Sequence, residues 1–187
     1  YAATKSAAGQ LALSYYKSFN TPIKIVKPFN TYGPRQSLRA VLPTIICQAL
    51  ENNEIKIGNL NTSRDLTYIE DTCKGFLSIL NSKKTFGEIV NIGSDNNYTV
   101  LDLIKKVSKI LNKKLITKKN KERVRPSKSE VYRLRCDNTK IQKLTNWKPR
   151  FHSGRGFEKG LENTIKWFSD KDNLNFYKKE MFKTYNV

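Results

Sequence analysis

The chain has 187 residues, of which 38% are hydrophobic, so it is long enough to bury a core of domain size. No apolar stretch is as long as a membrane span, and the three cysteines lie far apart without the spacing of metal ligands, so we expect a cytoplasmic protein with reduced thiols, no membrane segment and no metal. The net charge of +19 allows a nucleic-acid partner, and the positions of the lysines bear on that alternative.

The spacing of apolar residues, together with cap and turn residues, predicts alternating helices and strands. Asp71, Thr99 and Asn138 are expected to cap the helices that follow them. The alternation favours an α/β fold with some parallel sheet. Residues 118–135 are basic and lack such a pattern, so we expect an irregular loop there. The expected helices are 1–19, 41–52, 71–80, 100–111, 138–144 and 154–168, and the expected strands are 23–27, 55–57, 66–69, 88–92 and 115–117.

The lysines cluster in and after the predicted helix at 100–111. Within that helix they alternate with apolar residues such as Ile104 and Val107, so they fall on its solvated face. This pattern favours an ordinary solvated surface, whose positive field would attract an anionic ligand, over a dedicated nucleic-acid site. A basic binding module without catalysis remains the alternative from a different class.

Two residues at the start of the sequence could carry chemistry. Tyr1 and Lys5 are four residues apart among small, helix-compatible residues, so they would lie on one helix face. An ammonium near a phenol favours the phenolate and lowers the pKa of the tyrosine, which could then act as a general acid or base near neutral pH. Alone, such a pair is more often a packed aromatic ring and a solvated cation.

Three further segments favour a catalytic role for Tyr1 and Lys5. Residues 27–35 read Lys-Pro-Phe-Asn-Thr-Tyr-Gly-Pro-Arg and follow an apolar strand pattern, residues 64–71 read Arg-Asp-Leu-Thr-Tyr-Ile-Glu-Asp, and residues 91–93 read Asn-Ile-Gly. With the Tyr and Lys at the start, and in this order, they resemble the extended short-chain dehydrogenase/reductase family, the NAD(P)-dependent nucleotide-sugar epimerases and dehydratases. Residues 32–36 and 125–131 are most similar to the sugar 4,6-dehydratase branch.

The resemblance implies a Rossmann-type, doubly wound parallel sheet and a smaller mixed α/β substrate-binding lobe. Residues 1–33 and 86–93 would belong to the NAD-binding domain, 34–85 and 94–170 mainly to the lobe, and 171–187 to a C-terminal tail. The family's Gly-x-x-Gly-x-x-Gly loop, which holds the cofactor pyrophosphate, is not in this sequence. We therefore expect the chain to be the C-terminal part of a longer enzyme and to be inactive alone.

The resemblance also implies roles for residues near the cofactor, which is expected to be NAD rather than NADP. Tyr1 would be the catalytic acid/base for the sugar 4-hydroxyl, and Lys5 would hold the cofactor ribose. Pro28 and Phe29 would lie beside the nicotinamide. Asn30 would reach the substrate diphosphate, although an Asx turn after a strand would explain the same residue.

Arginines are the expected diphosphate ligands, because a guanidinium binds phosphate oxygens in a bidentate manner. Arg64 stands in the Arg-Asp-x-x-Tyr-x-x-Asp pattern, whereas Arg125 has Arg123 two residues away, which could take its place. Arg39 is a further, weaker candidate on the substrate side. Asp65 is expected to orient the backbone instead of binding substrate.

The leading prediction is an NAD-dependent nucleotide-sugar 4,6-dehydratase, in which oxidation at C4 precedes loss of water across C5 and C6. A 4-epimerase of the same family is the first alternative, because the residues that separate the two activities are expected upstream of this sequence. The implied partners are a nucleotide-diphosphate sugar and a second copy of the chain, with the helix at 1–19 in the dimer interface.

Overall fold

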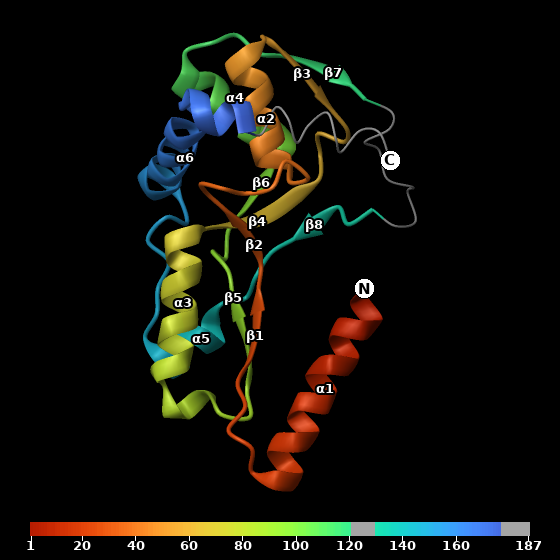
Figure 1. Cartoon of the computed structure of the whole chain (residues 1–187), viewed down its shortest axis with the longest axis vertical. Coiled ribbons are helices and arrows are strands. Elements are labelled where there is room, and N and C mark those ends of the chain that lie inside the picture. Colours follow the sequence, from red (N-terminus) through yellow and green to blue (C-terminus); the bar gives the residue numbers. More distant parts are fainter. Residues whose placement is uncertain (121–129, 177–187) are drawn as a thin grey trace.

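The computed structural model describes residues 1–120 and 130–176 (Figure 1). Its helices are α1 (Ala2–Phe19), α2 (Val41–Glu51), α3 (Ile69–Asn81), α4 (Val100–Leu111), α5 (Thr139–Thr145) and α6 (Gly154–Ser169), with a short 3₁₀ helix η1 (Lys83–Thr85). Its strands are β1 (Ile25–Pro28), β2 (Asn30–Tyr32), β3 (Glu54–Ile57), β4 (Ser63–Tyr68), β5 (Ile89–Ile92), β6 (Asn97–Thr99), β7 (Ile116–Lys119) and β8 (Arg133–Leu134). Helices and strands alternate along the chain, which confirms the α/β class. No helix in the described ranges is long and apolar enough to cross a membrane.

The first packed region is built on the parallel strand pair β1–β5. The strands lie in register from Ile25 opposite Ile89 to Pro28 opposite Ile92, so their carboxyl ends share one edge. Parallel strands need a long crossover connection, and α3 lies within the one that joins these two. Helices α3 and α5 pack against β5 and against each other. The core that they close contains Ile79, Val90, Ile92, Ile141 and Trp147.

The second packed region has β4 at its centre. Strand β2 pairs in parallel with the last residues of β4, whereas β8 pairs in parallel and β6 antiparallel with its first residues. Strands β3 and β7 form a separate parallel pair beside them. Helices α2, α4 and α6 pack on one another and bury the larger of the two cores. The expected division into domain and lobe remains a prediction; α3 and α5, which it assigns to the lobe, pack against β5 in the first region.

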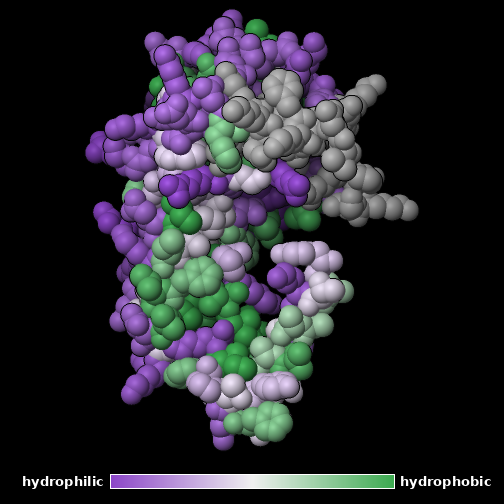
Figure 2. Space-filling view, viewed as in Figure 1, coloured by the Kyte–Doolittle hydropathy of each residue, from purple (hydrophilic) through white to green (hydrophobic). Residues whose placement is uncertain are grey.

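Helix α1 stands apart from both regions (Figure 1). None of its residues is buried, and near its C-terminal end the ring of Tyr16 lies against Gly87. A side chain at Gly87 would collide with that ring, and the φ angle of +71° there also favours glycine. Leu11 and Phe19 are 62% and 70% exposed. In the space-filling view a hollow separates the α1 arm from the body, and both carry apolar side chains (Figure 2). Such uncovered apolar surface is typical of a face that packs against further protein.

Three short strands were not predicted from the sequence. Strands β2 and β8 lie in stretches expected to be loops, and β6 begins in an expected turn. Each has two or three residues, and each pairs with β4. Whether such a short strand forms depends on its hydrogen-bonding partner and not on the local residue pattern, because strand propensity depends strongly on context.

The three predicted helix caps have different outcomes. Thr99 forms the N-cap of α4 with a complete capping box. The prediction for Asp71 is wrong, because α3 begins at Ile69 with Tyr68 as N-cap, and Asp71 lies in its first turn. Asn138 is the N-cap residue of α5, but its side chain accepts no hydrogen bond from the helix backbone.

Replacing Thr99 by alanine should lower the free energy of unfolding by about 1 kcal/mol, because the capping box is lost. Thr99 Oγ1 accepts from the backbone N–H of Asp102 at 3.0 Å, and the Asp102 carboxylate accepts from the Thr99 N–H at 3.0 Å. The Thr99 hydroxyl also donates to the Asp102 carboxylate at 2.6 Å, and this hydrogen bond, followed by the one from the Thr99 N–H, holds the pKa of Asp102 below its usual 3.8. A lowered folded-state pKa stabilises the protein above the unfolded pKa, and this contribution is lost as the pH falls through the folded value.

Urea unfolding of the wild type and of Thr99→Ala, at neutral pH and at about pH 3, checks this prediction. The difference in stability should be present at neutral pH and smaller in acid. Equal stability of the two proteins at neutral pH would contradict it.

Candidate functional site

Several predicted site residues lie where the chain leaves the parallel β1–β5 pair. Pro28 is the last residue of β1, Phe29 follows it, and Asn30 begins β2. The backbone N–H of Phe29 donates to the carbonyl of Ile92, the last residue of β5, at 2.8 Å. These residues therefore mark the carboxyl edge of the pair, which is where α/β sheets place their ligands.

The N-terminal end of α1 lies on the side of the same edge. Helix α1 runs in the direction opposite to β1, so its first residues lie toward the carboxyl end of that strand (Figure 1). Tyr1 is the N-cap residue, and its carbonyl accepts from the Lys5 N–H at 3.0 Å. The Lys5 ammonium lies 5.8 Å from the centre of the Tyr1 ring, and the Tyr1 side chain is open to solvent, 94% exposed.

Arg64 lies on β4, near Asn30 in the sheet. Asn30 is in register with Leu66, and alternate residues of a strand share a face, so Asn30 and Arg64 lie on one face of the β2–β4 pair. The Arg64 guanidinium contacts the segment that follows residue 129. Its Nη1 donates to the carbonyl of Val131 at 2.6 Å, and its Nη2 lies 3.5 Å from Glu130 Oε1.

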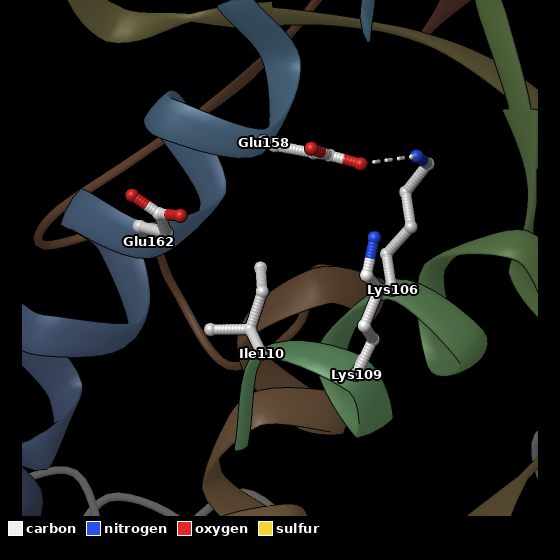
Figure 3. A pocket seen from close by; sticks show the side chains of 5 residues that line it. All are labelled: Lys106, Lys109, Ile110, Glu158 and Glu162. Atoms are coloured by element: carbon white, nitrogen blue, oxygen red, sulfur yellow. Dashed lines mark ion pairs between the residues drawn. The ribbon is translucent and has the colours of Figure 1, made fainter. Parts of the chain in front are cut away.

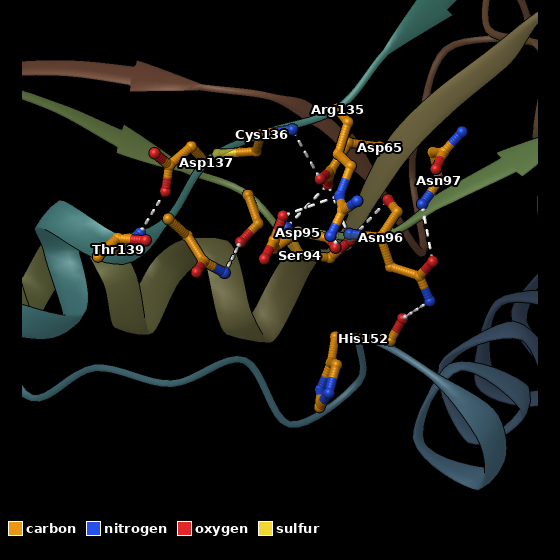
Figure 4. A network of polar contacts seen from close by, with 12 residues as sticks. Asp65, Ser94, Asp95, Asn96, Asn97, Arg135, Cys136, Asp137, Thr139 and His152 are labelled. Carbon is orange, nitrogen blue, oxygen red and sulfur yellow. Dashed lines mark hydrogen bonds and ion pairs between the residues drawn. The ribbon is translucent and has the colours of Figure 1, made fainter.

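Asp65, the next residue of β4, is fully buried and joins three segments of the chain (Figure 4). Its Oδ1 accepts from the backbone N–H and from the hydroxyl of Ser94, each at 2.8 Å, and from the Thr67 hydroxyl at 3.3 Å. Its Oδ2 accepts from the Cys136 N–H at 3.1 Å. The prediction that Asp65 orients the backbone is confirmed, because one carboxylate ties β4 to the turn after β5 and to the segment after β8.

Asp71 also orients backbone, but it binds the loop before α6 and does not cap α3. Its Oδ2 accepts from the N–H groups of Arg150 and Phe151 at 2.9 and 2.7 Å, and its carbonyl accepts from Trp147 Nε1 at 3.1 Å. Its Oδ1 is buried without a hydrogen-bond partner among the described residues. Asp71 therefore positions the loop that leads into α6.

Three tyrosines of the second region, Tyr32, Tyr68 and Tyr98, have a structural role. Burial raises the pKa of Tyr32 and Tyr68 above the usual value, and it raises the pKa of Tyr98 to about 12. The Tyr98 ring stacks on Phe157 with centroids 3.9 Å apart. Their raised pKa values and their packed rings make these three tyrosines poor candidates for an acid/base residue.

Some predicted residues are not brought together. Arg39 is exposed between β2 and α2, and no hydrogen bond or ion pair joins it to Asn30 or Arg64 among the described contacts. Arg125 lies outside the described residues. Helix α1, with its Tyr and Lys, stands apart from β2 and β4 (Figure 1). The roles assigned to all of these residues remain predictions.

Two residues that were not predicted from the sequence contact Arg64 and Asp65: Glu130 lies beside Arg64, and Ser94 binds Asp65. Glu130 stands in the motif at 125–131, and a carboxylate within a strongly basic stretch could have indicated an ion pair. Ser94 follows the Asn-Ile-Gly segment, and nothing in its surroundings indicates a buried aspartate 29 residues away as its partner.

A pocket of about 290 Å³ lies between α4 and α6, away from these residues (Figure 3). Lys106 and Glu158 form an ion pair across it at 3.6 Å. It is lined by Lys106, Lys109, Ile110, Glu158 and Glu162, none of which is a predicted site residue. Within residues 1–120 and 130–176, no group of three or more His, Cys, Asp or Glu side chains could hold a metal ion.

The parallel β1–β5 pair covered by α3 and α5 is a Rossmann-type arrangement, which the chain shares with solved extended short-chain dehydrogenase/reductases. The family model of GDP-mannose 4,6 dehydratase matches residues 1–163. The chain belongs to this family.

Relatives with two different activities are similar to the chain. UDP-glucuronate 4-epimerase of Thermodesulfobacterium geofontis is 32% identical over 180 residues, which are 95% of this chain and 52% of that protein. The crystal structure of UDP-glucuronic acid 4-epimerase from Bacillus cereus, in complex with UDP-glucuronic acid and NAD, has a TM-score of 0.76 at 30% identity and covers 88% of this chain and 51% of its own. The crystal structure of dTDP-glucose 4,6-dehydratase from Bacillus anthracis, in complex with NAD, has a TM-score of 0.78 at 26% identity, with coverages of 95% and 54%. The chain thus spans about half the length of these relatives.

Proposed function

We propose that this chain works in an NAD-dependent nucleotide-sugar 4,6-dehydratase. The observation that carries the proposal is the pair of Tyr1 and Lys5 one turn apart at the start of α1, whose N-terminal end lies toward the carboxyl end of β1, in a chain of this family. The proposal includes a cytoplasmic enzyme, a homodimer with α1 in its interface, and a division into an NAD-binding domain (1–33 and 86–93) and a mainly substrate-binding lobe (34–85 and 94–170).

Tyr1 and Lys5 share the proton-transfer step. Tyr1 is the acid/base residue that accepts the proton of the sugar 4-hydroxyl, and the ammonium of Lys5 lies beside its ring. Bound NAD supplies the acceptor for the hydride that leaves C4. The residues fit this cofactor, because the Lys5 ammonium has three N–H donors for ribose hydroxyls and lies one helical turn from a solvent-open phenol. The resulting 4-keto group acidifies the proton at C5, which permits loss of water across C5 and C6. The hydride then returns to C6 and a proton adds at C5, so the product differs from the substrate by one water.

We assign the substrate diphosphate to Asn30 and Arg64 on the β2–β4 pair. Asn30 and Arg64 share a face of the β2–β4 pair, next to the carboxyl edge, so both can contact one diphosphate. Pro28 and Phe29 line the nicotinamide side of the same edge. Arg125 and Arg39 would add further positive charge.

A 4-epimerase is the second candidate. The two epimerases at 32% and 30% identity favour it, whereas the dehydratase structure is 26% identical. In that reaction the 4-keto sugar turns over and receives the hydride on its other face, and no water is lost. A basic nucleic-acid-binding module is disfavoured, because the family match spans most of the chain.

Product analysis separates these activities. The full-length protein would be incubated with NAD and with UDP-, dTDP- and GDP-linked hexoses, and the products examined by mass spectrometry and NMR. We expect a product lighter by one water that carries a 4-keto group. A product of unchanged mass with inverted C4 would establish the epimerase instead. Absence of conversion with every sugar would contradict the proposed function.

A further inference from the structure

We propose that Glu130 is an internal counter-ion that competes with the substrate diphosphate for the guanidinium of Arg64. The proposal rests on the proposed function, which makes Arg64 a diphosphate ligand. It assigns to Glu130 the control of how tightly anions bind at this place.

The Arg64–Glu130 pair is largely covered by protein. The side chains are 21% and 9% exposed, and Nη2 of Arg64 lies 3.5 Å from Oε1 of Glu130. Opposite charges that are shielded from water attract each other more strongly than solvated ones. An anion that approaches Arg64 therefore meets a cation whose charge is already partly compensated.

Other contacts hold the guanidinium in place independently of Glu130. Nη1 donates to the carbonyls of Ser63 and Val131 at 2.9 and 2.6 Å. The segment that carries Val131 is itself attached to β4, because the Ser63 N–H donates to the Tyr132 carbonyl at 2.8 Å and β8 pairs with β4 beyond it. Loss of the carboxylate would thus leave Arg64 positioned but without its counter-charge.

Two anions then compete for one edge of the guanidinium. A diphosphate that binds there has to replace the attraction of Glu130, which lowers its net affinity. A small anion such as inorganic phosphate has few other contacts to offset this loss, whereas a nucleotide sugar has many. Glu130 would therefore keep the site clear of small anions and favour ligands that are also held elsewhere.

The test measures binding of UDP and of inorganic pyrophosphate to the full-length protein by isothermal titration calorimetry. Glu130→Gln keeps the size of the side chain and removes its charge, and we expect it to lower the Kd of both probes by about three- to tenfold. Glu130→Asp, whose shorter carboxylate is withdrawn from Arg64, should lower the Kd in the same direction. Thermal unfolding of each variant establishes that it is folded.

Glu158→Gln is the matched control, because it makes the same change in net charge at an ion pair between α4 and α6 that does not involve Arg64. It should leave both Kd values unchanged. The gain in Glu130→Gln should shrink at high salt, where ionic attraction is screened. If Glu130→Gln binds pyrophosphate no more tightly than Glu158→Gln does, the proposal is wrong.

Arg64→Ala distinguishes this proposal from the function on which it rests. We expect it to raise the Kd of UDP by about tenfold, the loss of one charge-assisted contact. If Arg64→Ala weakens binding while Glu130→Gln has no effect, the diphosphate site stands and the counter-ion role fails. If Arg64→Ala leaves the Kd unchanged, the diphosphate assignment of Arg64 fails, and the counter-ion proposal fails with it.

Discussion

In the full-length enzyme, Tyr1→Phe should lower kcat by about 10²–10⁴-fold, the usual contribution of a general acid or base. The phenylalanine ring would occupy the same place at the start of α1, but no group there could accept the proton of the 4-hydroxyl. Because this interaction is made mainly in the transition state, kcat and kcat/KM should fall together, with little change in substrate affinity. Steady-state kinetics at saturating NAD, with the sugar that the product analysis identifies, measures the effect.

Tyr15→Phe is the control for this experiment. It removes a hydroxyl from another exposed tyrosine of α1, 49% exposed, more than two helical turns from Tyr1. Its turnover should equal that of the wild type. Near-normal turnover of Tyr1→Phe would overturn the catalytic assignment and most of the proposed mechanism.

Asp65→Ala should lower the free energy of unfolding by about 3–5 kcal/mol, because several buried donors lose their acceptor together. The N–H groups of Ser94 and Cys136 would remain buried without the carboxylate that now binds them. Asp65→Asn keeps an oxygen that can accept from Ser94, so it should be less destabilising. Urea unfolding, with circular dichroism as the signal, measures both variants.

Asp95→Ala provides the matched comparison for Asp65. Asp95 also carries a carboxylate beside this network, but its ion pair with Arg135 at 2.9 Å is half exposed. Exposed pairs contribute little, so this variant should lose no more than about 1 kcal/mol. Equal destabilisation by Asp65→Ala and Asp95→Ala would show that the buried carboxylate does not hold the three segments together.

The sequence by itself predicted the features that depend on residues close to one another in the chain. The helix spacing of Tyr1 and Lys5 places both on one turn, and the structure has them there. Thr99 and the acidic residue three positions later form the cap of α4, because both groups belong to one helical turn. The order of the motifs indicated the family, which the match over residues 1–163 confirms.

Only the tertiary structure decided the features whose partners are distant in sequence. Arg64 and Val131 are 67 residues apart, and Asp65 and Cys136 are 71 residues apart. Strands β2, β6 and β8 exist because β4 offers them hydrogen-bonding edges, and Asp71 binds a loop about 80 residues downstream instead of capping its own helix. Local propensity carries no information about such partners, because packing of the whole chain selects them. The sequence alone therefore determined the family and the residues that could carry chemistry, whereas the folded chain decided which carboxylate lies beside Arg64.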